Sequence, residues 1–179
     1  HAFGLFISYR VLADKDFAES LYQKASPLLE SQRPRMHVYL DKVELKDGER
    51  FGPGFIGGLS TSIVFTPVIS AGCVQGFVEL GREDREDFVL MEWMVALELH
   101  EQGEIKSIFP IVKGKQQSDG RFDNTFFEQL RDGRVDCEPL PDTVSTKTVA
   151  KARECLGMLT PPVALTTELT TKTVVEKVL

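Results

Sequence analysis

The stretch TSIVFTPVI, from Thr61 to Ile69, is a run of mostly apolar side chains that is rich in β-branched and aromatic residues. Its length and composition are typical of a strand that is buried inside a sheet. Parallel sheets bury their strands in this way because the connecting helices cover both faces. The stretch therefore predicts a buried parallel strand.

Three further runs are also about as long as a strand and are rich in β-branched and aromatic residues. They are FGLFIS from Phe3 to Ser8, MHVYL from Met36 to Leu40, and SIFPIV from Ser107 to Val112. Amphipathic stretches separate the runs. Strands that alternate with helices predict a doubly wound parallel sheet with helices on both faces.

Helical spacing appears in four places between or after these strands. A crossover helix is predicted by Phe17, Leu21, Ala25 and Leu28. DFVLMEWMVALELHEQG predicts a second helix, which we expect to stop at Gly103. The pattern is weaker in DNTFFEQLRDG and STKTVAKARECLG. Residues 160–179 are rich in Pro and Thr and predict either a linker or a docked terminal segment.

Composition limits the classes of function. With 179 residues and 42% hydrophobic residues, the chain can bury one substantial core. A net charge of -6, with 21 scattered Lys and Arg, argues against a nucleic-acid surface. Three Cys without a CxxC pair predict reduced thiols in the cytoplasm and no zinc site. No apolar run approaches the roughly 20 residues that span a bilayer, and His1 opens the chain without a signal-peptide pattern, as in a domain cut from a longer protein.

The segment GPGFIG, residues 52–57, matches the G-x-G-x-x-G spacing of dinucleotide-binding turns. That fingerprint requires a strand immediately before it and an acidic residue about 20 positions later. Neither is present. The segment therefore predicts a weakly helical stretch, and no Gly-Lys-Ser/Thr phosphate loop occurs elsewhere.

Glu92 is a charged residue in an otherwise apolar pattern. In a helix it shares one apolar face with Phe88, Ala96 and Leu99. An unpaired carboxylate buried there costs several kcal/mol, so it must be partnered, protonated or at the rim of a cavity. Perturbed carboxylates are candidate functional groups. The alternative is a helix-boundary Glu that pairs with a nearby Arg or Lys.

Several motifs, in this order, resemble those of a Toll/interleukin-1 receptor (TIR) domain. They are FISYR at Phe6 to Arg10, YLDKVELKDGERF at Tyr39 to Phe51, FTP at Phe65 to Pro67, DFVLMEWMVAL, and FFEQL at Phe126 to Leu130. The resemblance covers about Phe3 to Leu159. It implies a TIR domain over residues 1–159 and a flavodoxin-like sheet of about five parallel strands.

The charged loop after the second predicted strand corresponds, by this resemblance, to the self-association loop of TIR domains. It contains Asp41, Leu45, Lys46, Gly48 and Arg50. The resemblance implies homotypic contacts with other TIR domains through this loop. The alternative is that its charges only solvate a connection.

Some TIR domains cleave NAD⁺ and others are scaffolds, and a Glu four residues after an aromatic residue marks the enzymatic type. Phe88 and Glu92 have this spacing. The resemblance further implies that Tyr9, Arg10 and Phe88 bind the nucleotide substrate, with Thr66 at the floor of the pocket. Tyr can stack on a base and Arg can neutralise a pyrophosphate, while a core-edge Tyr and a surface Arg are the alternatives.

The sequence departs from the closest animal enzymes at several positions. Val11 stands where they have a second Arg, and Phe88 replaces a Trp. The residues around Cys73 lack the family's Tyr and Trp. The acidic insertion VELGREDRED also offers other candidates for the catalytic carboxylate, which are Glu79, Glu83 and Glu86.

These observations predict an NAD⁺ glycohydrolase that acts in immune or cell-death signalling and is activated by self-association. NAD⁺ is then the substrate, with Glu92 as the catalytic residue and without a cofactor or a metal. The alternative is a non-enzymatic TIR adaptor that binds other TIR domains. A flavodoxin-like receiver or flavin binder is disfavoured because the first strand lacks the acidic cluster or hydroxyl-rich phosphate loop that these proteins need.

Overall fold

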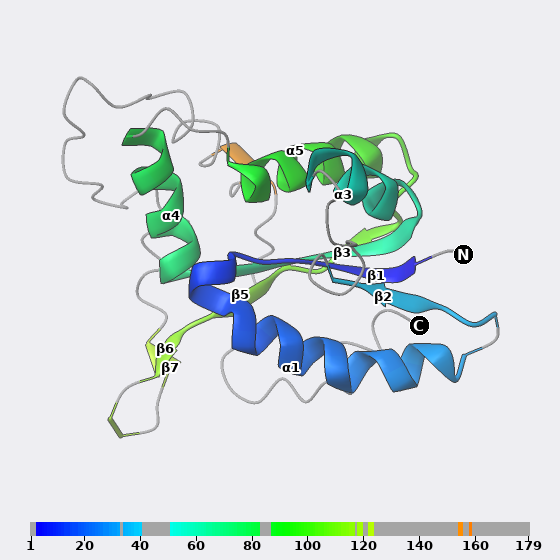
Figure 1. Ribbon diagram of the computed structural model, residues 1–179, viewed down its shortest axis with the longest axis horizontal. Coiled ribbons are helices and arrows are strands. Elements are labelled where there is room, and N and C mark those ends of the chain that lie inside the picture. The colour runs from blue at the N-terminus through cyan, green and yellow to red at the C-terminus, as the bar shows by residue number, and fades with distance from the viewer. Residues whose placement is uncertain are drawn as a thin grey trace.

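The computed structural model describes residues 3–32, 34–40, 51–82, 87–116, 118–119, 122–123, 154–155 and 158. The strands are β1 (Phe3–Ser8), β2 (His37–Tyr39), β3 (Ser62–Ser70), β4 (Ser107–Ile108), β5 (Ile111–Lys113), β6 (Lys115–Gln116) and β7 (Phe122–Asp123). The helices are α1 (Val11–Glu30), α3 (Phe51–Ser60), α4 (Ala71–Arg82) and α5 (Phe88–Glu101). Figure 1 shows their arrangement.

The main sheet has five parallel strands in the order β2-β1-β3-β4, with β5 pairing with β3 as well. This order confirms the predicted doubly wound sheet. The predicted strand from Ser107 to Val112 is interrupted, so it supplies both β4 and β5. Pro110 lies in the interruption, where it has no N–H to donate to β3. A short antiparallel pair, β6 and β7, lies outside this sheet.

Helices cover both faces of the sheet, with α1 on one side and α3, α4 and α5 on the other (Figure 1). Each side has its own hydrophobic cluster. The α5-side cluster contains Phe6 of β1, and the α1-side cluster contains its neighbours Leu5 and Ile7. The alternation follows from the period-two geometry of a strand. It also determines on which side each polar residue at the end of β1 lies.

The predicted crossover helix is present as α1, but its buried face differs from the prediction. Leu21 and Ala25 are buried as expected, whereas Leu28 is 41% exposed and Leu29 is buried instead. The helix is longer than predicted and continues through Pro27. Over this length the 3.6-residue period moves the apolar face by one position.

Helix α5 begins and stops where the sequence predicted. Asp87 accepts a hydrogen bond from the backbone N–H of Leu90 (3.1 Å) and so caps the first turn. Gly103 follows the last turn with φ 76°, a left-handed conformation that glycine adopts readily. The predicted stop at Gly103 is therefore confirmed.

Several predicted segments lie outside the described residues. They are the self-association loop with Asp41, Leu45, Lys46, Gly48 and Arg50, the FFEQL motif, most of STKTVAKARECLG, and residues 160–179. The domain boundary near residue 159 therefore stays a prediction. In the part of the chain that the structure describes, none of the helices is long and apolar enough to cross a membrane.

The glycine-rich helix α3 confirms that GPGFIG lies in a helix, and it supplies a matched pair of substitutions. A Cβ on Gly58 would lie 2.5 Å from the ring of Tyr39, whereas a Cβ on Gly57 would meet nothing within 4 Å. We expect Gly58→Ala to destabilise the domain by about 1 to 3 kcal/mol through overpacking. Gly57→Ala should instead stabilise it by up to about 1 kcal/mol through helix propensity. Denaturant unfolding of both variants measures the difference, and equal free energies of unfolding would contradict the close packing of Tyr39.

Candidate functional site

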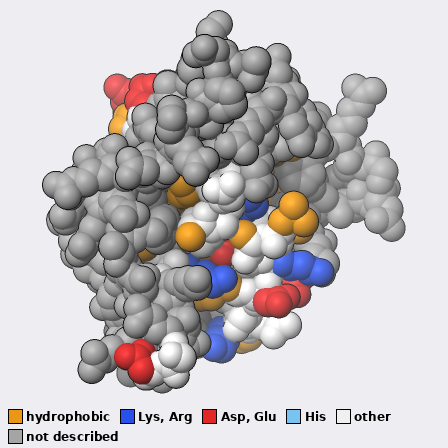
Figure 2. Space-filling model, turned by 90° about the vertical axis from the view of Figure 1, so that its left-hand side faces the viewer, with side chains coloured by type: hydrophobic (Ala, Val, Ile, Leu, Met, Phe, Trp, Pro, Cys, Tyr) orange, Lys and Arg blue, Asp and Glu red, His pale blue; other side chains and the backbone are white. Residues whose placement is uncertain are grey.

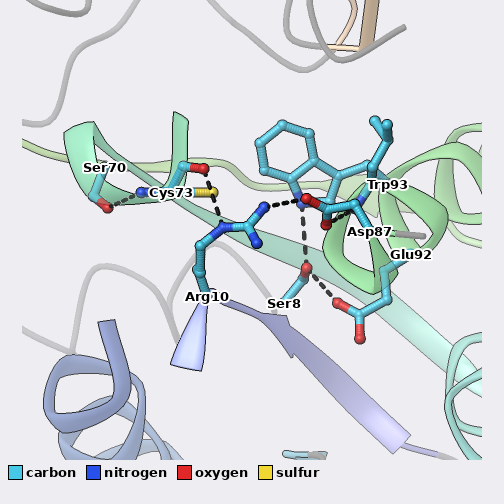
Figure 3. A network of polar contacts seen from close by, with 8 residues as sticks. Ser8, Arg10, Ser70, Cys73, Asp87, Glu92 and Trp93 are labelled. Carbon is cyan, nitrogen blue, oxygen red and sulfur yellow. Dashed lines mark hydrogen bonds and ion pairs between the residues drawn. The ribbon is translucent and has the colours of Figure 1, made fainter. Parts of the chain in front are cut away.

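A buried carboxylate lies beside the carboxyl end of β1. Glu92 of α5 is 4% exposed, and its Oε2 accepts a hydrogen bond of 2.6 Å from the hydroxyl of Ser8. The same hydroxyl oxygen accepts the indole N–H of Trp93 at 3.2 Å (Figure 3). Ser8 ends β1, so a central strand and a helix are joined through this carboxylate. Ligands of doubly wound sheets usually bind outside the carboxyl ends of the strands.

Arg10 follows β1 and points to the same side of the sheet as Ser8. Its Nη2 contacts Oδ2 of Asp87 at 2.6 Å, and its Nε–H donates to the carbonyl oxygen of Cys73 at 3.1 Å (Figure 3). The guanidinium carbon also lies 4.7 Å from the ring centroid of Phe77. Because Asp87 also caps α5, this ion pair ties the start of α5 to the end of β1.

A second polar cluster lies where α1, β3 and β5 meet. The hydroxyl of Ser70 donates to Oδ2 of Asp14 at 2.7 Å, and Nζ of Lys113 contacts Oδ1 of Asp14 at 3.1 Å. Asp14 is fully buried, and its two partners are at the carboxyl ends of β3 and β5. Ser70 also accepts the backbone N–H of Cys73 at 3.0 Å, so the cluster adjoins the Arg10 contacts. Its members satisfy one another, as buried polar groups must.

Cys73 lies between the two clusters, and its side chain is fully buried. Burial raises the pKa of its thiol to about 12, although the positive charge of Arg10 opposes the shift. The thiolate is the reactive form of cysteine, and burial disfavours it here. Among the residues that the structure describes, no group of three or more His, Cys, Asp or Glu could hold a metal ion.

Figure 2 shows the end of the molecule at which the carboxyl ends of the parallel strands lie. Lys or Arg, Asp or Glu, and hydrophobic side chains gather there in the middle of the view. Positive and negative side chains therefore both occur at the carboxyl edge of the sheet. Arg10 follows β1 at this edge, and Lys113 ends β5 there.

The predicted burial of Glu92 is confirmed, with small differences in its neighbours. Ala96 is buried on the same face of α5, and Leu99 packs against the α5-side cluster. Phe88 is 40% exposed at the first position of the helix. Glu92 is therefore buried in the core, while Phe88 lies at the edge of the core.

The predicted substrate residues divide between the two sides of the sheet. Tyr9 belongs to the α1-side cluster, and Thr66 lies between Val64 and Val68 of that cluster along β3. Glu92 and Arg10 are on the opposite side. Tyr9 is 4% exposed, and its role in binding a substrate stays a prediction. Thr66 is fully buried, and its hydroxyl has no hydrogen-bond partner among the described residues.

Several residues of the network were not predicted as site residues. They are Ser8, Asp14, Asp87 and Trp93. Asp14 could have been found, since it precedes Ala18 by one helical turn on the buried face of α1. Asp87 carried the signal of a helix N-cap residue. No local pattern indicates that Ser8 and Trp93 meet at Glu92.

The order of the strands defines the class of protein as an open, doubly wound α/β domain of the flavodoxin-like type. No family model matches the chain, and no curated protein matches it in sequence. Solved structures do match. One is of the TIR domains of the activated Roq1 resistosome, which directly recognises the pathogen effector XopQ. The identity is 16% and the TM-score 0.56, over 97% of this chain and 95% of that chain. The chain therefore has the fold of a TIR domain, as its motifs predicted.

Proposed function

We propose that this protein is a TIR-type NAD⁺ glycohydrolase in which Glu92 is the catalytic carboxylate. The observation that carries the proposal is the burial of Glu92 at 4% exposure beside the carboxyl end of β1, within a TIR fold. A carboxylate in the core of a small domain carries a desolvation cost. A Leu or Met at this position would pack as well without the desolvation cost. A buried charge is therefore more often found where it has a function.

One carboxylate is sufficient for this reaction. The glycosidic C–N bond breaks with its electron pair going to the nicotinamide nitrogen, so the cationic ring leaves as a neutral molecule. No acid is needed to protonate the leaving group, in contrast to ordinary glycoside hydrolysis. Glu92 would accept hydrogen bonds from the ribose hydroxyls and stabilise the oxocarbenium-like transition state. Water then adds to the ribosyl carbon and loses a proton, giving ADP-ribose, or an adenine nitrogen adds and gives a cyclic product.

Arg10 is the proposed partner for the pyrophosphate of NAD⁺. Its side chain is 12% exposed and already contacts Asp87. A pyrophosphate would therefore have to share the guanidinium with Asp87 or displace it. Because Tyr9 and Thr66 face the α1 side, the proposal assigns them no contact with the ribose.

We further propose that the domain acts in immune or cell-death signalling in the cytoplasm, through association with other TIR domains. The support is the fold of the Roq1 resistosome TIR domains, which belong to an activated assembly that recognises a pathogen effector. The alternative is a non-enzymatic adaptor with the same contacts. The ion pair between Arg10 and Asp87 favours this alternative, because the guanidinium that would bind the substrate pyrophosphate already has a partner.

Nicotinamide release from NAD⁺ by the purified domain tests the proposal and its dependence on assembly. We propose that association with a neighbouring copy activates the site, so the rate per molecule should rise with protein concentration. Charge reversal at Lys46 or Arg50, in the proposed association loop, should reduce that rise. A rate that stays constant over about a hundredfold dilution would contradict activation by assembly. Absence of release at every concentration would favour the adaptor.

A further inference from the structure

The hydroxyl of Ser8 has a fixed direction of hydrogen bonding. An indole N–H can only donate, so Ser8 Oγ accepts from Trp93 and keeps its own hydrogen for another partner. That partner is Oε2 of Glu92 at 2.6 Å, a distance typical of a charge-assisted O–H···O⁻ bond. The chain of bonds therefore runs one way, from Trp93 through Ser8 to the Glu92 carboxylate.

Ser8 is also a rigid support. It is 1% exposed and lies at the end of β1, which pairs with β2 on one side and β3 on the other. Its own register partner is Pro67 of β3. The pairing with β2 ends at Phe6, so the pairing at Ser8 is with β3. A Glu side chain on a helix has three rotatable bonds, and a hydrogen bond to a buried strand hydroxyl restricts where its carboxylate can lie.

We propose that Ser8 is a positioning residue for Glu92: it orients the carboxylate toward the ribose and does not itself contact the substrate. This inference rests on the proposed function. A misdirected carboxylate loses transition-state stabilisation more than substrate binding, because the ribosyl charge develops only during the reaction. Loss of Ser8 should therefore lower kcat while KM changes little.

The test compares Ser8→Ala with Glu92→Gln and with a matched control, Ser62→Ala. Ser62 is a buried serine of β3 whose hydroxyl donates to the carbonyl of Gly58 at 2.7 Å, away from the carboxyl end. We expect Ser8→Ala to lose about tenfold in kcat, with KM within about twofold, and Ser62→Ala to keep the turnover of the unaltered domain. If Ser8→Ala does not fold, Ser8→Cys preserves the packing with a weaker donor and should shift kcat in the same direction.

A second measurement follows the contact itself. Trp93 is the only tryptophan of the chain, so its indole N–H gives one NMR signal. Ser8→Ala should move that signal because the N–H loses its acceptor, and Ser62→Ala should not.

The outcomes separate the two proposals. Full turnover in a folded Glu92→Gln variant contradicts the proposed function. An inactive Glu92→Gln together with full turnover in folded Ser8→Ala or Ser8→Cys overturns only the role of Ser8. A raised KM with unchanged kcat also overturns it, since Ser8 would then act on binding.

Discussion

Glu92→Gln is expected to lower turnover by at least about 100-fold while the fold survives. Glutamine keeps the volume and can still accept the hydrogen bond that Ser8 donates to Oε2. The negative charge is lost and one acceptor oxygen becomes an NH2 donor, so the effect on rate reports the loss of the anion and of an acceptor for the ribose hydroxyls. Stability should change little or rise, because neutralising a carboxylate that is 4% exposed removes its desolvation cost. Nicotinamide release and the melting temperature, measured on one preparation, give both quantities.

Glu98→Gln is the matched control for this variant. Glu98 is on the same helix but exposed, and its side chain accepts a hydrogen bond from Gln102 at 3.2 Å. We expect this control to leave both the rate and the melting temperature unchanged. A structural Glu92 would behave differently: its loss would destabilise the domain by a few kcal/mol, and activity would fall only as far as the protein unfolds. Full activity in folded Glu92→Gln would move the catalytic assignment to another carboxylate, such as Glu86.

The layers of the fold could be predicted because they follow from composition and periodicity. The apolar run from Thr61 to Ile69 needed no further information to be assigned as a buried strand, and β3 is found at Ser62–Ser70. Gly103 could be identified as a helix stop from its position after an amphipathic pattern. The interruption at Pro110 was also readable in principle, since proline cannot donate to a ladder, but the length of the run concealed it.

The site was predicted only in part, and the reason lies in side-chain direction. Along FISYR, Phe6, Ser8 and Arg10 share one face of β1, while Ile7 and Tyr9 share the other. The alternation was visible in the sequence, and it separates Tyr9 from Arg10. The family resemblance implied that both residues line the nucleotide pocket. Long-range packing determines which face of β1 is covered by α5. No local sequence pattern predicts that choice.

Asp87→Asn is expected to destabilise the domain by about 2 to 3 kcal/mol. The amide keeps an oxygen that can accept the N–H of Leu90, so the cap of α5 remains. The guanidinium of Arg10 loses its counter-charge but keeps the carbonyl of Cys73 and the ring of Phe77. Because Arg10 is 12% exposed, the loss should lie below the 3 to 5 kcal/mol given by breaking a fully buried pair.

Asp87→Ala removes the cap as well as the charge, so it should cost about 1 kcal/mol more than Asp87→Asn. The free energy of unfolding from denaturant titration measures both, with Asp16→Asn on the exposed face of α1 as the control for losing a carboxylate. In the double variant Arg10→Met with Asp87→Asn, no unpaired cation remains, and part of the loss should be recovered as a coupling energy. If Asp87→Asn unfolds at the same free energy as the unaltered domain, the ion pair does not hold α5 to β1. Arg10 would then be available to a substrate phosphate at no cost to the fold.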